Sequence, residues 1–182
     1  MTFPDKKFDT AGAFSNAYFG ALNIAACSVD RDRIDQAAQI LSAAYNARKT
    51  VYACGNGGSA AISNHLHCDH LKGVQTDTGL KPRVVSLSST IETLTAIAND
   101  ISYDDVFLYQ LRTTAEQGDV LITISSSGDS VNVVKAAEWA RENGLMVIAL
   151  TGFSGGRTAK LADVNVHVDA DNYGVIEDLH QS

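Results

Sequence analysis

The sequence predicts an α/β protein with a mainly parallel, five-stranded sheet that is flanked by helices. Short apolar runs rich in β-branched residues recur along the chain, and stretches of helical periodicity separate them. The first four runs are continuous enough in apolar residues to be parallel strands that are buried on both faces. Strands and helices that alternate in this way form a layered sheet with right-handed crossovers.

The elements follow one another in a regular order. The expected strands occupy residues 50–54, 83–87, 119–124, 146–150 and 164–168. Helical patterns lie between them at residues 59–72, 89–98, 104–117 and 131–143, and two further helices are expected ahead of the sheet, at residues 8–29 and 34–48. We expect residues 1–49 to pack on the sheet domain and on other subunits, and residues 50–182 to form the ligand-binding domain of one structural unit.

The first helix has a broad apolar stripe, made of Phe14, Ala17, Tyr18, Ala21, Leu22 and Ala25. A helix at one end of a small domain rarely needs so wide a stripe for its own packing. Association between subunits and packing on the chain's own sheet both account for the stripe.

Composition narrows the class of protein. The chain of 182 residues is 45% hydrophobic, which is enough for one substantial core. It has 14 basic and 21 acidic residues without a long run of either sign, so we expect no nucleic-acid partner. No segment has the length of a membrane span, and the three widely spaced cysteines favour buried free thiols in a reducing compartment. We therefore expect a cytoplasmic protein with no membrane partner.

The strongest candidate for a binding site is the stretch that we call the serine loop, residues 125–130. It places four hydroxyls, those of Ser125, Ser126, Ser127 and Ser130, between a buried strand and a helix. Unpaired N–H groups and the positive end of the helix dipole favour a phosphate there, and serine hydroxyls can donate to it. One serine would suffice for a simple helix cap, so four favour a phosphate site.

A second loop follows the first strand, at residues 55–59, and we call it the glycine loop. Its residues Asn56, Gly57, Gly58 and Ser59 lead directly into a helix. Glycines there let a ligand approach the backbone closely, although a tight turn alone would need one of them. The pattern is neither a dinucleotide fingerprint nor a P-loop. Because ligands bind beyond the carboxyl ends of parallel strands, both loops are expected at the same edge of the sheet.

Titratable residues occur in two clusters. His65 and Asp69 are four residues apart on one helix face, which suits either a shared divalent metal or a proton-transfer pair, while a partly exposed polar face would need neither. Glu177 and His180 stand near the end of the chain and could complete the site. Asn99 and Asp100 could bond sugar hydroxyls or simply end a helix. Residues 151–156, which follow the fourth strand, form a glycine-rich segment that a plain turn explains as well as a ligand-binding loop does.

These motifs resemble, in their order, those of the bacterial phosphoheptose isomerases of the sugar isomerase (SIS) superfamily. The resemblance rests on residues 55–59, 98–100, 124–130, 149–152 and 176–180, and it extends from about residue 10 to the end of the chain. It implies a flavodoxin-like SIS fold, a homotetramer with sites between subunits, and a sugar phosphate substrate. The implied reaction is the aldose–ketose isomerisation of sedoheptulose 7-phosphate for surface-polysaccharide heptose synthesis.

The resemblance also implies roles for individual residues. The serine loop matches the phosphate-binding loop, and five residues match sugar-contacting segments: Asn56, Gly57, Gly58, Asn99 and Asp100. His65 matches a zinc ligand. Two positions depart from the pattern, because Asp69 replaces a glutamate that is both zinc ligand and base, and Glu177 replaces a glutamine.

The last zinc-binding histidine of the family would fall a few residues beyond Ser182, so either the chain stops short of it or His180 takes its place. The predicted metal ligands are therefore His65, Asp69 and Glu177, and the predicted catalytic residues are Asp69, Glu177 and His180.

The expected mechanism passes through an enediol, with Asp69 or Glu177 as the base and zinc polarising the carbonyl oxygen. Two alternatives belong to other classes of function. One is a noncatalytic SIS protein that binds sugar phosphates or partner proteins, and the other is an isomerase of a different sugar phosphate. The His65 and Asp69 pair argues against the first, and the departures at positions 69 and 177 support the second.

Overall fold

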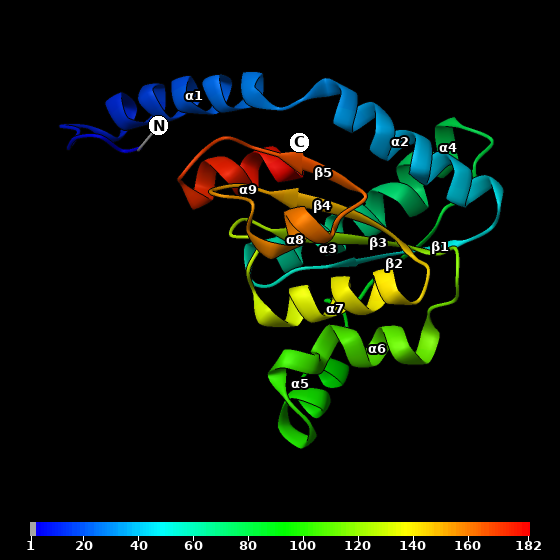
Figure 1. Cartoon of the computed structure of the whole chain (residues 1–182). Helices are drawn as coiled ribbons and strands as arrows, with labels where there is room; N and C mark the ends of the chain where they lie inside the picture. Colours follow the sequence, from blue (N-terminus) through cyan, green and yellow to red (C-terminus); the bar gives the residue numbers. More distant parts are fainter. Residues whose placement is uncertain (1–2) are drawn as a thin grey trace.

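Five parallel strands form one sheet in the order β2-β1-β3-β4-β5, in a computed structural model that describes residues 3–182 (Figure 1). The strands are β1 (Thr50–Cys54), β2 (Arg83–Ser86), β3 (Val120–Ser125), β4 (Met146–Thr151) and β5 (Val164–His167). This is the flavodoxin-like strand order, so the predicted fold class is confirmed. The order reverses between β1 and β3, and ligands of such sheets bind at that switch point, beyond the carboxyl ends of the strands.

Burial of the strands follows their place in the sheet. Every residue of the central strand β3 is buried, as expected for a strand covered on both faces. The edge strand β2 instead alternates between exposed and buried positions, and its Val85 is 41% exposed. The expectation that β2 is buried on both faces is therefore wrong, because an edge strand has a neighbouring strand on one side alone and is covered less completely by helices.

Helices cover both faces of the sheet (Figure 1). The main helices are α1 (Ala11–Ser28), α2 (Arg31–Asn46), α3 (Gly58–Cys68), α5 (Ile91–Asp100), α6 (Val106–Thr114), α7 (Val131–Glu142) and α9 (Tyr173–Gln181). Shorter segments are the π-helix η1 (Asp69–Val74), α4 (Gln75–Asp77), the 3₁₀-helix η2 (Tyr103–Asp105) and α8 (Gly156–Leu161).

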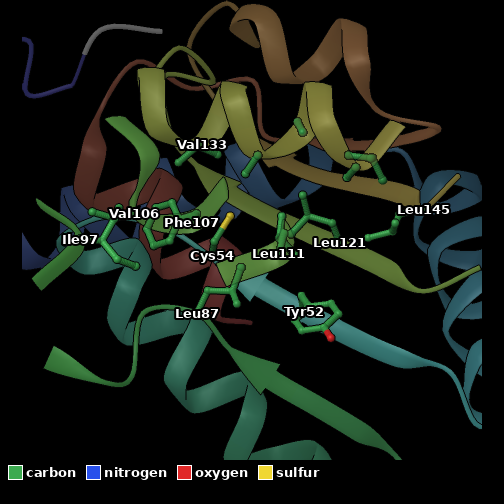
Figure 2. Packing of buried hydrophobic residues seen from close by; sticks show 14 residues of the cluster. Tyr52, Cys54, Leu87, Ile97, Val106, Phe107, Leu111, Leu121, Val133 and Leu145 are labelled. Atoms are coloured by element: carbon green, nitrogen blue, oxygen red, sulfur yellow. The ribbon is translucent and has the colours of Figure 1, made fainter. Parts of the chain in front are cut away.

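Two hydrophobic cores lie on opposite faces of the sheet. On one face, Phe107 and Leu111 of α6 and Val133 of α7 pack against Leu121 of β3 (Figure 2). On the other face, side chains of α2 and α3 cover alternate residues of the same strands. Alternate residues of each strand point to opposite faces, so one apolar strand supplies both cores.

Four details of the chain differ from the sequence-based expectation. The helix expected over residues 59–72 widens into a π-helix at Asp69, and the one expected from residue 104 begins as a 3₁₀-turn. Helix α8 was not expected, because its six residues are too few to show a periodic pattern. All cysteines are free as expected, but Cys27 and Cys68 are exposed and Cys54 alone is buried.

Helix α1 lies over α9 (Figure 1). Its residues Tyr18, Ala21, Leu22 and Ala25 pack against the buried side chains of α9, so this part of the apolar stripe serves the chain's own core. The side chains of Phe14, Phe19 and Ile24 stay exposed. None of the described helices combines the length and the apolar character that crossing a membrane requires.

Candidate functional site

The serine loop has its backbone fixed by two of its own hydroxyls. The Ser125 Oγ accepts from the Gly128 N–H at 3.1 Å, and the Ser127 Oγ accepts from the Asp129 N–H at 3.3 Å. As acceptors in these bonds, both hydroxyls keep their own proton free to donate. The Ser126 Oγ is buried and has no partner among the described residues. A buried hydroxyl without a partner is costly unless a ligand or water completes its bonding.

The serine loop lines a hollow of about 160 Å³ at the carboxyl edge of the sheet. The other lining residues come from the end of β3, the glycine loop and α9, and they are Ile124, Asn56, Ser59, Tyr173 and Glu177. The hollow is large enough for a phosphate and part of a small sugar. Three separate segments of the chain therefore meet where the strand order reverses.

The glycine loop brings α3 to the hollow with its first turn uncapped. Gly57 has φ +54° and precedes the helix without a side-chain cap, and this positive φ favours glycine. The first N–H groups of α3 therefore have no capping side chain of their own, which leaves the positive end of the helix available to an acidic group. Behind them, Ser59 is buried.

Asn56 and Asn132 join the glycine loop to the start of α7. Each carboxamide donates to the other at 2.9 Å, and the Tyr103 Oη also donates to the Asn56 Oδ1 at 2.9 Å. Asn132 is 2% exposed, and its Oδ1 accepts from the Val133 N–H as well. This pairing fixes the two ligand-binding loops relative to each other.

Glu177 reaches the hollow because α9 packs closely on α3. Helix α9 begins after Asn172, whose Oδ1 accepts from the Val175 N–H at 3.1 Å, and Val175 and Ile176 are buried beneath it. The Glu177 carboxylate then lies directly over Gly58, in space that a β-carbon at that position would occupy. A carboxylate at the positive end of a helix dipole interacts favourably with it.

A contact with α1 supports α9 from the other side. The Tyr18 Oη donates to the Asp178 Oδ2 at 2.6 Å. Burial, together with this carboxylate, raises the pKa of the Tyr18 phenol to about 12, so it remains a donor at neutral pH.

His65 and Asp69 form a pair away from the hollow. The His65 Nε2 lies 3.1 Å from the Asp69 Oδ2, and both side chains are more than half exposed. The neighbouring His67 Nδ1 bonds to the Val84 carbonyl at 2.7 Å, and so, as expected, it does not share their face. His65 lies seven positions along α3 from Gly58, a rise of about 10 Å, so Glu177, which lies over Gly58, does not join the pair.

The predicted metal ligands therefore do not form one set in this structure. Among residues 3–182, apart from the side chain of residue 77, no three histidine, cysteine or acidic side chains lie close enough to hold a metal ion. His65 and Asp69 supply two donors, whereas zinc in catalytic sites has three protein ligands.

His180 also lies apart from the hollow. It lines an apolar cavity of about 370 Å³ between α9, α2 and the sheet. Both ring nitrogens are buried without a partner among the described residues, and burial lowers the pKa of the imidazole. The structure thus places this predicted catalytic residue in a different cavity from Glu177, although the two residues are three positions apart on α9.

Asn99 and Asp100 do not line the hollow either. They are exposed at the end of α5, where the Asn99 Nδ2 donates to the Asp100 Oδ1 at 2.7 Å. Within one chain, the position of these two residues therefore agrees with the second interpretation of their sequence, that they end a helix.

Sequence reasoning missed three residues around the hollow: Tyr103, Asn132 and Tyr173. Asn132 offered a signal, because it is a polar residue in the apolar stretch Val131–Val134 at the start of a helix. The two tyrosines offered none, because only the folded chain brings η2 and α9 to this edge of the sheet.

Comparison with known proteins finds related chains over most of this sequence. The SIS domain family matches residues 18–152. The probable phosphoheptose isomerase of Thermoplasma volcanium is 38% identical over 163 residues, which are 90% of this chain and 83% of that protein. The phosphoheptose isomerase of Mycobacterium tuberculosis is 41% identical over 143 residues, 77% of this chain and 71% of that one.

Solved structures give the same result. Phosphoheptose isomerase GmhA from Neisseria gonorrhoeae superimposes with a TM-score of 0.85 at 33% identity, and covers 94% of this chain and 93% of that one. A phosphoheptose isomerase from Francisella tularensis also has a TM-score of 0.85, at 29% identity, over 94% of this chain and 92% of that one.

Proposed function

The chain belongs to the phosphoheptose isomerase family of SIS-domain proteins, and we propose that it interconverts sedoheptulose 7-phosphate and a heptose 7-phosphate. Membership of this family favours a sugar-phosphate isomerase over the noncatalytic alternative. The reaction is an aldose–ketose isomerisation, which needs a site that binds the phosphate and a base near the sugar carbonyl.

One observation carries the proposal: the serine loop and the Glu177 carboxylate line the same hollow. The loop supplies hydroxyl donors and a helix N-terminus for the phosphate. The phosphate then acts as a remote anchor whose binding energy positions the sugar. Glu177 supplies the single carboxylate among the residues that line the hollow.

We assign the proton transfer to Glu177. Its carboxylate takes the proton from the carbon next to the carbonyl, and electrons of the broken C–H bond form the double bond of the enediolate. The same carboxylate returns the proton to the neighbouring carbon, while a proton moves from one sugar oxygen to the other. Asp69 is the weaker candidate, because its carboxylate faces His65 outside the hollow.

Zinc remains a prediction for this protein. His65 and Asp69 are the residues that would hold it, and a third ligand is not among the described side chains around them. No step of the proton transfer above depends on the metal. Metal analysis of the purified protein tests the prediction directly.

We also propose a homotetramer in the cytoplasm. The exposed apolar side chains of Phe14, Phe19 and Ile24 on α1 support association between copies of the chain. The three free cysteines fit a reducing compartment. Light scattering at micromolar concentration tests the assembly, and a folded, active monomer would contradict it.

Product analysis by NMR tests the reaction. The purified protein is incubated with sedoheptulose 7-phosphate, with and without added zinc, and the aldose product is followed with time. Sedoheptulose without phosphate is the matched control, and it should react far more slowly because it lacks the anchor. Absence of any aldose product in both metal conditions would refute the assigned activity.

A further inference from the structure

The side chain of Arg157, which lies outside the hollow, binds the serine loop. Arg157 of α8 makes three bonds to Asp129, the acidic residue of the loop. The Arg157 backbone N–H and Nε both donate to the Asp129 Oδ1, at 3.1 and 2.8 Å, and the Nη2 donates to the Asp129 carbonyl at 2.8 Å. The guanidinium thus forms hydrogen bonds to both the side chain and the backbone of Asp129.

The turn that carries Arg157 is packed backbone to backbone on the serine loop. A β-carbon at Gly128 would overlap the Gly155 carbonyl, and one at Gly156 would lie 2.5 Å from the Ser127 carbonyl oxygen. The Thr158 N–H donates to the Gly128 carbonyl at 3.0 Å, and the Gly152 N–H donates to the Ser126 carbonyl at 2.9 Å. Residues 151–156 are therefore more than a plain turn, because they form a support on which the phosphate loop rests.

The charge of Asp129 explains why a cation is needed there. The Asp129 carboxyl is ionised at neutral pH, as an exposed aspartate ordinarily is, and the bonds from Arg157 lower its pKa further. A carboxylate on the loop would repel a phosphate dianion bound by the neighbouring serines. Arg157 is not among the residues that line the hollow, so its charge cancels that of Asp129 without contacting the ligand.

We propose that Arg157 is a positioning residue for phosphate binding, which holds the serine loop through Asp129 and cancels the negative charge of that loop. The inference deepens the proposed function, because it assigns the control of phosphate affinity to a residue outside the site. It predicts an effect on ground-state binding of phosphate and little effect on proton transfer.

The test compares Arg157→Gln, Asp129→Asn and the double variant. Binding of inorganic phosphate is followed by ³¹P NMR titration, and KM and kcat are measured with sedoheptulose 7-phosphate. Arg157→Gln should weaken phosphate binding and raise KM by about fivefold to twentyfold while kcat changes less than about twofold. Added salt should reduce this defect, since it screens the exposed Asp129 carboxylate.

The double variant distinguishes the electrostatic role of Arg157 from its role in holding the backbone of the serine loop. Asp129→Asn in the Arg157→Gln background removes the repelling carboxylate, so it should return phosphate affinity to within about threefold of the original protein. A double variant as weak as Arg157→Gln would overturn the electrostatic role, and an Arg157→Gln protein with unchanged affinity would overturn the inference altogether. Arg157→Lys keeps the charge and should retain most of the affinity even if the neutral variant folds poorly.

Arg33→Gln is the matched control. It removes the same charge from an exposed pair on α2, where the Arg33 Nε lies 4.0 Å from the Asp30 Oδ2, and it should leave phosphate affinity unchanged. Failure of the proposed reaction can be distinguished from failure of this inference. Phosphate titration measures the role of Arg157 even in a protein that does not turn over the sugar. Turnover that is insensitive to Arg157→Gln would instead refute the inference and leave the reaction standing.

Discussion

Glu177 of α9 and Gly58 of α3 lie in such close contact that Glu177 occupies the space of the missing Gly58 side chain. The two residues are far apart in the sequence, and each comes from a different motif. Their contact places a carboxylate at the open end of α3, beside the serine loop. The absence of a side chain at position 58 therefore determines where the proposed base stands.

Gly58→Ala should lower activity without destabilising the fold. A methyl group at position 58 displaces the end of a flexible glutamate, which costs little folding energy, and alanine loses less backbone entropy on folding than glycine does. We expect unchanged or higher thermal stability with a loss of kcat of about 100-fold, because a displaced base loses its alignment. Gly79→Ala, where a β-carbon meets no atom within 4 Å, is the control and should keep full activity.

Glu177→Gln keeps the size of the side chain and removes its ability to accept a proton. If Glu177 is the base, kcat should fall by about 100-fold or more while KM for the sugar phosphate changes little. The measurement is steady-state kinetics beside the matched variant Asp69→Asn. A larger loss of kcat in Asp69→Asn than in Glu177→Gln would reverse the assignment of the base.

Ser127→Ala and Ser130→Ala should each weaken phosphate binding by about 1–2 kcal/mol, through loss of charge-assisted hydrogen bonds. Competition by inorganic phosphate measures the effect. Ser42→Ala, at an exposed position of α2, serves as the control. Unchanged affinity in the Ser127→Ala/Ser130→Ala double variant would show that the phosphate binds elsewhere.

His65→Ala should remove bound zinc and leave the fold intact, because the His65 side chain is 56% exposed. Zinc is measured by mass spectrometry of the purified protein. Asp69→Glu restores the longer carboxylate of the family pattern and should preserve or raise activity. Full zinc content in His65→Ala would rule out a metal at this pair, and a tenfold loss of activity in Asp69→Glu would indicate a shorter carboxylate fitted to another role.

His180 should make the protein less stable in mild acid. Burial lowers its pKa in the folded state below the ordinary value of 6.5, so the unfolded chain binds the proton more tightly. The free energy of unfolding should therefore decrease as the pH falls below about 6.5, and His180→Leu should remove part of this slope. Denaturant titrations at several pH values measure it, with Gln181→Leu as a control that removes no titratable group. An identical slope in His180→Leu would contradict the role of this imidazole.

Much of the fold was predictable from local patterns. The strands at residues 50–54 and 146–150 were expected within one residue of their ends, because a run of apolar residues between turns encodes a buried strand. The serine and glycine loops were expected at one edge, since the carboxyl ends of parallel strands meet there, and both line the hollow. The π-helix at Asp69 left no such pattern, because it differs from an α-helix by one residue per turn.

The sequence by itself determined the layered sheet, the order of the motifs and the residue types that can bind a phosphate, because these depend on periodicity and on short spacings along the chain. Only the tertiary structure decided which titratable residue meets the serine loop. Asp69, Glu177 and His180 were all predicted catalytic residues, and the packing of α9 on α3 and α1 brings Glu177 to the hollow, whereas His180 lines a separate apolar cavity. That choice depends on contacts between segments more than 100 residues apart, which no local pattern encodes.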